Sequence, residues 1–209
     1  MPHTEPDHLV ITAATLDAGV AWVEERLGVS LSPRRGGQHD RQGTHNALLS
    51  LGPDFYLEVI AINPDAPVPN HPRWFGMDTV GPEPRLHHWV CRTSNLADAL
   101  EKSAIKPGEI EQMSRGTLRW LITIAPDGQL KTDGTMPSLI EWQSKPHPAA
   151  GLEDKGYRLQ KLEVHHPRAQ EVKTSLSAAG MLDTRVEFAT GGPMLTATIQ
   201  TPSGPRVLG

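Results

Sequence analysis

The chain has almost no cysteine, no long apolar run and no concentration of positive charge. Its 209 residues contain one cysteine, Cys91, so an internal disulfide framework is excluded and a reducing compartment is expected. No apolar stretch approaches the roughly 20 residues that a membrane-spanning helix needs, and residues 1–7 lack the pattern of a secretory signal. The net charge of −4 without a basic stripe argues against a nucleic-acid binder. We expect a cytoplasmic protein that binds neither nucleic acid nor a membrane, with Cys91 as a small buried residue.

Glycine and proline are abundant, with nineteen of each, and they lie between short apolar runs instead of forming one tract. This distribution predicts frequent turns in a sheet-rich protein and not disorder. Within it, one order of elements recurs. Residues 8–13 read as a strand, Thr15 as the N-cap of a helix that ends at Gly28, and a Gly-rich hairpin zone (36–43) precedes strands at 46–51 and 55–62.

The same order returns twice. A second round has a strand at 88–93, a helix capped by Asn95, and strands at 109–113, 118–125 and 138–142. A third, shorter round starts with a strand at 159–165, followed by a helix that ends at Gly180 and three short strands. We predict an α+β fold of repeated βαβββ modules, two of them paired into a curled mixed sheet around a cleft and the third a shorter extension. The expected boundaries are 1–63, a linker loop at 64–85, 86–148, and 149–209.

Histidine and glutamate occupy matching places in the first two rounds. His8 and His88 each open a first strand seven residues before its helix cap, and Glu58 and Glu141 each lie in a last strand. A carboxylate between apolar neighbours is costly to bury without a partner. A divalent cation held by His8, Glu58, His88 and Glu141 would offset that cost, and these donors suit iron, manganese, nickel, cobalt or zinc without choosing among them.

Taken singly, each of these residues is more often a satisfied structural group, and the correspondence between rounds is what favours a ligand set. The third round departs from it, because Lys161 stands where His8 and His88 stand and no acid follows in its last strand. We therefore expect the third round to be metal-free.

Four stretches of the first round are Asp7-His8-Leu9-Val10-Ile11, the helix end Arg26-Leu27-Gly28-Val29, and residues 43–52 and 56–60. Together they resemble a glyoxalase-like domain of the vicinal-oxygen-chelate superfamily, which also includes bleomycin-resistance proteins and dioxygenases. The resemblance is closest over 7–63 and fades after about residue 157. It implies paired βαβββ modules that curl around a metal, with ligands at His8, Glu58, His88 and Glu141. It further implies a metal-dependent lyase, isomerase or dioxygenase acting on a small oxygenated metabolite, with Glu141 as the first candidate for the catalytic base and Glu58 as the second.

Five residues are candidates for substrate binding: His45, Asn46, Arg92, Arg119 and Trp74. Each also has a structural interpretation. His45 and Asn46 could cap a turn, the two arginines could form salt bridges, and Trp74 could pack onto the body of the protein. The alternative function is a non-catalytic protein that sequesters a drug or metabolite in the same cleft, walled by aromatic side chains. A homodimer is compatible with either function but is not required, because two modules in one chain can close one site.

Overall fold

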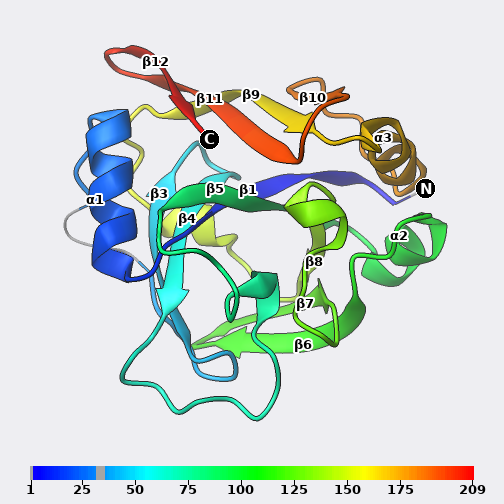
Figure 1. Ribbon diagram of the computed structural model, residues 1–209, viewed down its shortest axis with the longest axis horizontal. Coiled ribbons are helices and arrows are strands. Elements are labelled where there is room, and N and C mark those ends of the chain that lie inside the picture. The colour runs from blue at the N-terminus through cyan, green and yellow to red at the C-terminus, as the bar shows by residue number, and fades with distance from the viewer. Residues whose placement is uncertain (1, 32–35) are drawn as a thin grey trace.

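The computed structural model describes residues 2–31 and 36–209 and confirms the α+β architecture with its βαβββ order (Figure 1). The first round comprises β1 (Thr4–Thr12), α1 (Leu16–Leu27), β2 (Gln38–His39), β3 (Thr44–Ser50) and β4 (Tyr56–Ile62). The second comprises β5 (Arg85–Thr93), α2 (Leu96–Lys102), β6 (Glu109–Arg115), β7 (Leu118–Ile124) and β8 (Ser138–Trp142). The third comprises β9 (Arg158–His165), α3 (Ala169–Ala178), β10 (Val186–Ala189), β11 (Met194–Thr201) and β12 (Gly204–Leu208).

The helix boundaries follow from local chemistry. The Thr15 side chain accepts a hydrogen bond from the N–H of Ala18, and Gly28 closes α1 in the left-handed conformation at φ 65°. Asn95 caps α2 in the same way, accepting from the N–H of Asp98. The three sequence-predicted caps are therefore confirmed.

The first eight strands form one curled mixed sheet in the order β2-β3-β4-β1-β5-β8-β7-β6. Within each round the first and last strands are parallel, β1 with β4 and β5 with β8, and the two rounds meet through the antiparallel pair β1 and β5. The two rounds are thus related by an approximate twofold axis through that central pair. This is the pairing of βαβββ modules that the resemblance implies.

The third round has the same element order but a different strand arrangement. Its sheet runs β10-β9-β11-β12, so β9 lies parallel to β10 and not to the last strand. This sheet, with α3, covers the outer face of β1 and β5, as the ribbon shows along its upper side (Figure 1). The extension is therefore a cover for the central strands and not a third copy of the paired modules.

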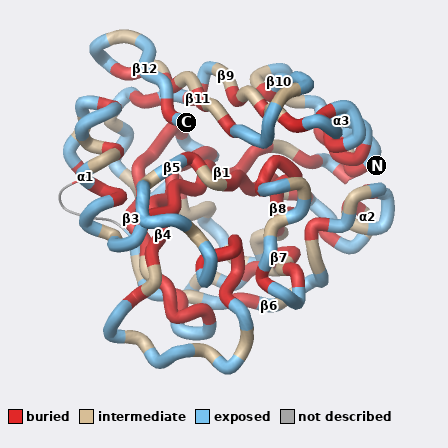
Figure 2. Tube along the Cα trace, in the orientation of Figure 1, coloured by how far each residue is buried: buried red, intermediate tan, exposed pale blue. Residues whose placement is uncertain are grey.

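Strand alternation divides the apolar residues between two cores. Leu9, Ile11 and Trp89 point outward and pack with the third round, whereas Val10 and Val90 point inward with the aromatic residues of the concave side. The trace coloured by burial shows β1 and β5, the central strands of the eight-stranded sheet, as mostly buried (Figure 2). Cys91 lies in the outer core and is fully buried, as predicted.

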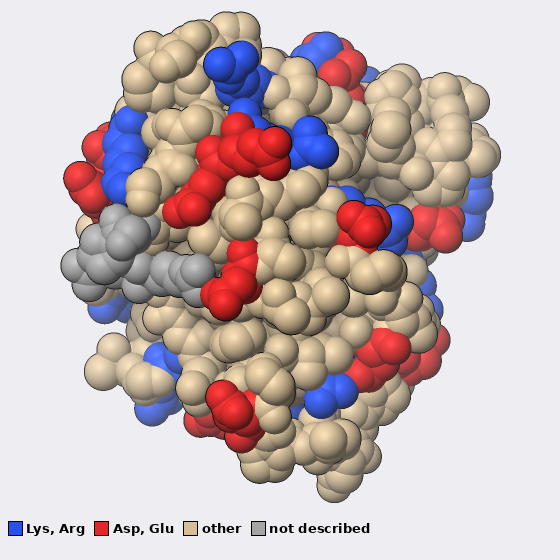
Figure 3. All heavy atoms as spheres, turned by 60° about the vertical axis from the view of Figure 1, so that its left-hand side comes forward, with Lys and Arg blue, Asp and Glu red and all other residues tan. Residues whose placement is uncertain are grey.

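The surface carries no concentrated charge on the face shown in Figure 3, where acidic and basic side chains alternate in small groups. No helix among the described residues is long and apolar enough to cross a membrane.

Candidate functional site

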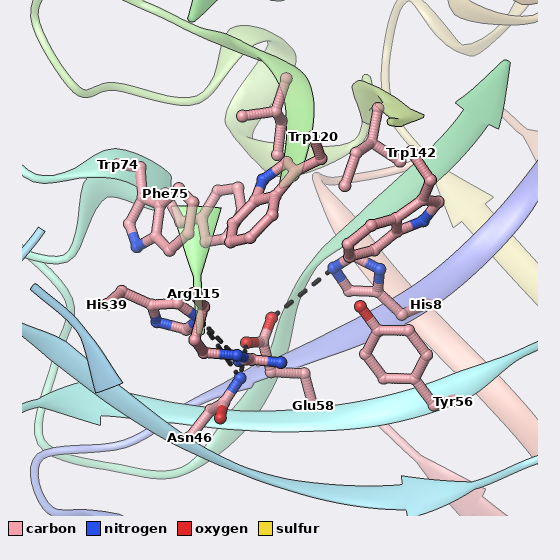
Figure 4. A pocket seen from close by; sticks show the side chains of 12 residues that line it. His8, His39, Asn46, Tyr56, Glu58, Trp74, Phe75, Arg115, Trp120 and Trp142 are labelled. Carbon is pink, nitrogen blue, oxygen red and sulfur yellow. Dashed lines mark hydrogen bonds and ion pairs between the residues drawn. The ribbon is translucent and has the colours of Figure 1, made fainter. Parts of the chain in front are cut away.

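The concave side of the eight-stranded sheet holds a cleft with a polar floor and an aromatic roof (Figure 4). The cleft is defined here by the residues that line it: His8, His39, Asn46, Tyr56, Glu58, Trp74, Phe75, Arg115, Trp120, Ile122, Ile140 and Trp142. The free space between these side chains is about 20 Å³, room for little more than one water molecule, and it opens to solvent. A ligand larger than water therefore requires the lining side chains to move.

Two neighbouring residues of β1, Asp7 and His8, form a hydrogen-bonded pair at the floor of the cleft. Successive side chains of a regular strand point to opposite faces, but the pairing of β1 with β5 shifts register between Pro6 and His8. This bulge at Asp7 lets its Oδ1 accept from Nδ1 of His8 over 2.6 Å. The bond fixes the tautomer of His8 and leaves its Nε2 as the atom available to the cleft.

Asp7 is fully buried, and two further groups donate to it. Oδ2 accepts from Nε1 of Trp142 over 3.0 Å and from Nε2 of His147 over 2.9 Å. Burial alone would raise the pKa of Asp7, but the hydrogen bonds and charges of His147 and His8 outweigh it and hold that pKa well below its ordinary value. Asp7 is therefore a carboxylate under the floor, out of reach of a ligand.

Glu58 of β4 stands opposite His8 in the cleft. Its Oε2 lies 3.6 Å from Nε2 of His8, and its Oε1 accepts from Nδ2 of Asn46 over 2.5 Å. Figure 4 shows Glu58 in the middle of the floor, with His8 and Tyr56 on one side and Asn46 on the other. The Tyr56 ring stacks on the imidazole of His8 at a centroid distance of 4.5 Å, which fixes its orientation. One nitrogen and one carboxylate oxygen thus face each other, each held by a second residue.

The two edges of the curled sheet are joined by side chains near the cleft. Nη1 of Arg115, at the end of β6, donates to Nε2 of His39 in β2 over 2.9 Å, and Arg41 forms an ion pair with Glu111 at 2.7 Å. Burial and, to a smaller extent, the charge of Arg115 lower the pKa of His39 to about 3. His39 is therefore a neutral acceptor, and its Nδ1 donates to Thr44 Oγ1 over 3.1 Å.

Four aromatic side chains form the roof. Trp74 and Phe75 stack at a centroid distance of 4.8 Å in the short 3-10 turn Trp74–Gly76, and Trp120 contacts Trp142 at 5.4 Å. Phe75 adopts a left-handed φ of 56°, which turns its ring onto the cleft side of β5. The indole N–H of Trp74 is buried and has no hydrogen-bond partner among the described residues.

His88 does not join this floor. Its Nδ1 donates to the carbonyl of Gly134 over 3.0 Å, and its Nε2 accepts from the N–H of Ser138 over 3.1 Å. The Phe75 ring packs 5.2 Å from the imidazole, and His88 is absent from the cleft lining. Burial lowers the pKa of His88 to about 3, partly offset by the bond to Gly134. Both ring nitrogens are used within the protein.

The approximate twofold axis explains why Glu141 is not the counterpart of Glu58. Leu9 lies opposite Trp89, so the axis exchanges His8 with His88 and Val10 with Val90. Val10 lies beside Glu58, and Val90 lies beside Ser138. The residue that corresponds to Glu58 is therefore Ser138, three positions before Glu141.

Glu141 points to the other face of β8, between the cleft residues Ile140 and Trp142. Its Oε2 accepts from the N–H of Leu96, the first residue of α2, over 2.7 Å. The expectation that Glu141 is a ligand and the first candidate for the base is corrected by this placement, because its carboxylate caps a helix.

Of the five candidates for substrate binding, some line the cleft and others lie outside it. Asn46 and Trp74 line the cleft. His45 lies outside it, against Leu16 and Ile62. Arg92 binds Glu5 and backbone carbonyls, and Arg119 is exposed and donates to the carbonyls of Gly116 and Leu118. His45, Arg92 and Arg119 are therefore removed from the candidate site.

The donor set does not fit the metal centre that the resemblance implies. In residues 2–31 and 36–209, no group of three or more His, Cys, Asp or Glu side chains is arranged to hold a metal ion. His8 and Glu58 supply two donors, fewer than the three or four protein ligands of usual zinc sites. His88 and Glu141 are engaged elsewhere, and His39 already accepts from Arg115. The chemistry derived below uses no metal.

Several cleft residues were not predicted from sequence. Asp7 precedes His8 in the sequence, but its contact with the imidazole depends on a β-bulge that the spacing of apolar residues does not predict. Tyr56 shares a strand face with Glu58, a signal that was available. Arg115 reaches the cleft only because the β6–β7 hairpin curls over it, and His39 belongs to a strand of two residues.

Comparison with known proteins agrees with the fold. The glyoxalase-like domain family matches residues 7–180. A hypothetical protein from Staphylococcus aureus superimposes with a TM-score of 0.58 at 12% identity, covering 98% of this chain and 84% of that chain. Methylmalonyl-CoA epimerase from Mycobacterium tuberculosis gives 0.41 at 21% identity, covering 70% and 91%. The epimerase from Streptomyces coelicolor gives 0.43 at 21%, covering 68% and 99%. No curated protein matches. Since the family match spans most of its length, the chain belongs to the glyoxalase-like domain family.

Proposed function

We propose that the chain is an isomerase- or lyase-type enzyme that moves a proton on a small oxygenated molecule, with His8 and Glu58 as its acid–base pair. The observation that carries this proposal is the 3.6 Å approach of His8 Nε2 to Glu58 Oε2, two side chains that are only 5% and 6% exposed. An imidazole nitrogen and a carboxylate oxygen at this separation can serve together as the acid and the base of a proton transfer. Such a pair can take a proton with one group and return it with the other.

The reaction follows from that arrangement. The Glu58 carboxylate takes a proton from a carbon next to a carbonyl group, and the electron pair moves onto the carbonyl oxygen. The protonated imidazole of His8 then returns a proton to the same or the neighbouring atom, and the second proton moves from Glu58 back to His8. The products contain the atoms of the substrate, so no oxidant or reductant is needed.

The surrounding residues position this pair. Asp7 holds the imidazole and stabilises its charged form, and Asn46 holds the carboxylate through Oε1. Dioxygenase chemistry is not part of the proposal, because the donor set does not fit the metal that oxygen activation uses.

The experiment is deuterium incorporation into carbon acids in D₂O, followed by proton NMR. A panel of small 2-oxo acids, 2-hydroxyaldehydes and β-dicarbonyl compounds is incubated with the purified protein. We expect loss of the acidic C–H signal of at least one compound in the wild type, and none with His8→Gln. The matched control is His165→Gln, since His165 lies half-buried in the outer sheet.

A non-catalytic binding protein is the alternative, favoured by the aromatic roof of Trp74, Phe75, Trp120 and Trp142. It predicts that compounds bind without deuterium incorporation and that His8→Gln leaves binding unchanged. Binding of a panel member with no exchange in the wild type would replace the enzyme proposal by this one.

A further inference from the structure

Arg115 is the single lysine or arginine among the described residues that line the cleft, and its charge is not matched there by an ion pair. Six other arginines in the described chain pair with a carboxylate: Arg41, Arg73, Arg92, Arg158, Arg168 and Arg185. Arg115 instead donates through Nη1 to His39. Its guanidinium is thus placed in a ligand site with a neutral partner.

The partner is a weak one. His39 is uncharged, because burial and the adjacent guanidinium lower its pKa to about 3. A carboxylate brings an opposite charge that neutral His39 lacks, and the planar guanidinium can form two parallel hydrogen bonds with it. None of the hydrogen bonds recorded for the described residues uses Nε or Nη2 of Arg115. A carboxylate that enters the cleft can therefore displace His39 and gain a second bond.

Arg115 lies close enough to the proposed acid–base pair for an anion bound by its guanidinium to approach His8 and Glu58. Asn46 Nδ2 lies 3.5 Å from His39 Nε2 and donates to Glu58 Oε1, so one side chain separates the Arg115–His39 contact from Glu58 (Figure 4). An anion bound at Arg115 places its neighbouring carbon toward Glu58 and His8. The groups that face it are the cation of Arg115 and the side chains of His8 and Glu58, with Asp7 beneath the floor.

We propose that the substrate is a small carboxylic acid, and that its carboxylate replaces His39 as the acceptor of the Arg115 guanidinium. This inference names the substrate class of the proposed function and rests on that function for the reacting carbon. Binding, however, can be measured without turnover. The free space in the cleft is about 20 Å³, so the lining must move to admit even a small acid, and the release of Arg115 from His39 is such a movement.

The test uses 2-oxobutanoate, 2-hydroxybutanoate and crotonate as probes, with 2-butanone and crotonamide as neutral counterparts, in isothermal titration calorimetry. We expect at least one acid to bind and the neutral compounds to bind about tenfold more weakly or worse. Arg115→Gln should weaken the acid by about tenfold or more, and Arg115→Lys should retain part of the affinity because it keeps the charge without the fork. Arg119→Gln is the matched control, since Arg119 is exposed on the adjacent strand and outside the cleft.

A second measurement covers the case in which Arg115→Gln disturbs folding. In the wild type labelled with ¹⁵N-histidine, the acid should shift the Nε2 resonance of His39 as Arg115 leaves it, and 2-butanone should not. Equal affinity for acids and neutral counterparts, or an unchanged His39 resonance at saturation, overturns the inference.

The outcomes also separate this inference from the proposed function. If deuterium is incorporated into neutral carbon acids only, the inference that the substrate is a carboxylic acid is wrong, and the proposed proton-transfer function is retained. Acid binding that depends on Arg115, with no exchange in any compound, supports the inference and overturns the proposed function.

Discussion

Nδ1 of His8 lies 2.6 Å from Oδ1 of Asp7, a carboxylate with no exposed surface. This contact turns the remaining imidazole nitrogen toward Glu58, and the chemistry of the cleft depends on it. Replacing Asp7 with Asn therefore affects both activity and stability.

Asp7→Asn keeps the shape of the side chain but removes the charge and one acceptor. We expect proton-transfer activity to fall about 100-fold or more, because His8 loses its tautomer and the partner of its charged form. The free energy of unfolding should fall by about 2 to 4 kcal/mol, since Asp7 accepts bonds from three buried or half-buried donors. Urea unfolding and the deuterium assay measure these effects. Glu5→Gln on the same strand is the control and should change stability by less than about 1 kcal/mol.

Stability should depend on pH through two buried histidines. The pKa values of His39 and His88 are lowered to about 3, and a histidine in the unfolded chain titrates near 6.5. Between these values the unfolded state binds more protons, so the stability contributed by neutral burial is complete above about pH 6.5 and is lost as pH falls toward 3. Each group contributes a slope of about 1.4 kcal/mol per pH unit in the steep region. Chemical denaturation from pH 4 to 7 measures it, and a flat profile would contradict the burial of neutral rings.

Glu141→Ala should separate structural from catalytic acids. The carboxylate of Glu141 accepts from the first N–H of α2, so its removal should cost about 0.5 to 2 kcal/mol of stability. At a temperature where the variant is folded, deuterium incorporation should equal that of the wild type. Loss of activity in folded Glu141→Ala would restore Glu141 to the site.

Removal of metal should have little effect. With two protein donors in the cleft, we expect no stoichiometric transition metal by elemental analysis of protein purified without chelator. Treatment with EDTA should leave Tm and activity unchanged. A bound metal whose loss lowers Tm in the wild type, but not in His8→Gln or Glu58→Gln, would show that the cleft is a metal centre.

The sequence was sufficient to predict the order of elements, the helix caps and four of the cleft residues, His8, Asn46, Glu58 and Trp74. These follow from local signals, namely apolar alternation, capping residues and turn chemistry. What it did not reveal depends on register. Ser138, not Glu141, is the counterpart of Glu58, because the register between β5 and β8 places Ser138 beside Val90. This register cannot be predicted from the sequence, since the irregular segment 126–137 precedes β8.

The remaining residues of the cleft depend on tertiary geometry. Asp7 reaches His8 through a bulge, and Arg115 reaches His39 because the sheet curls until its two edges meet. The third round illustrates the same limit, since its element order matched the other two and its strand pairing did not. Periodicity reports which face a residue occupies but not which strand lies beside it.

Deuterium incorporation by Glu58→Gln tests the central proposal most directly, because this substitution keeps the acceptor for Asn46 and removes only the charge facing His8. Glu163→Gln on the outer sheet, which pairs with Lys161, serves as the matched control. The account predicts a rate at least about 100-fold below wild type for Glu58→Gln, with ligand binding and Tm retained, and an unchanged rate for Glu163→Gln. A folded Glu58→Gln protein that exchanges deuterium at the wild-type rate would contradict it.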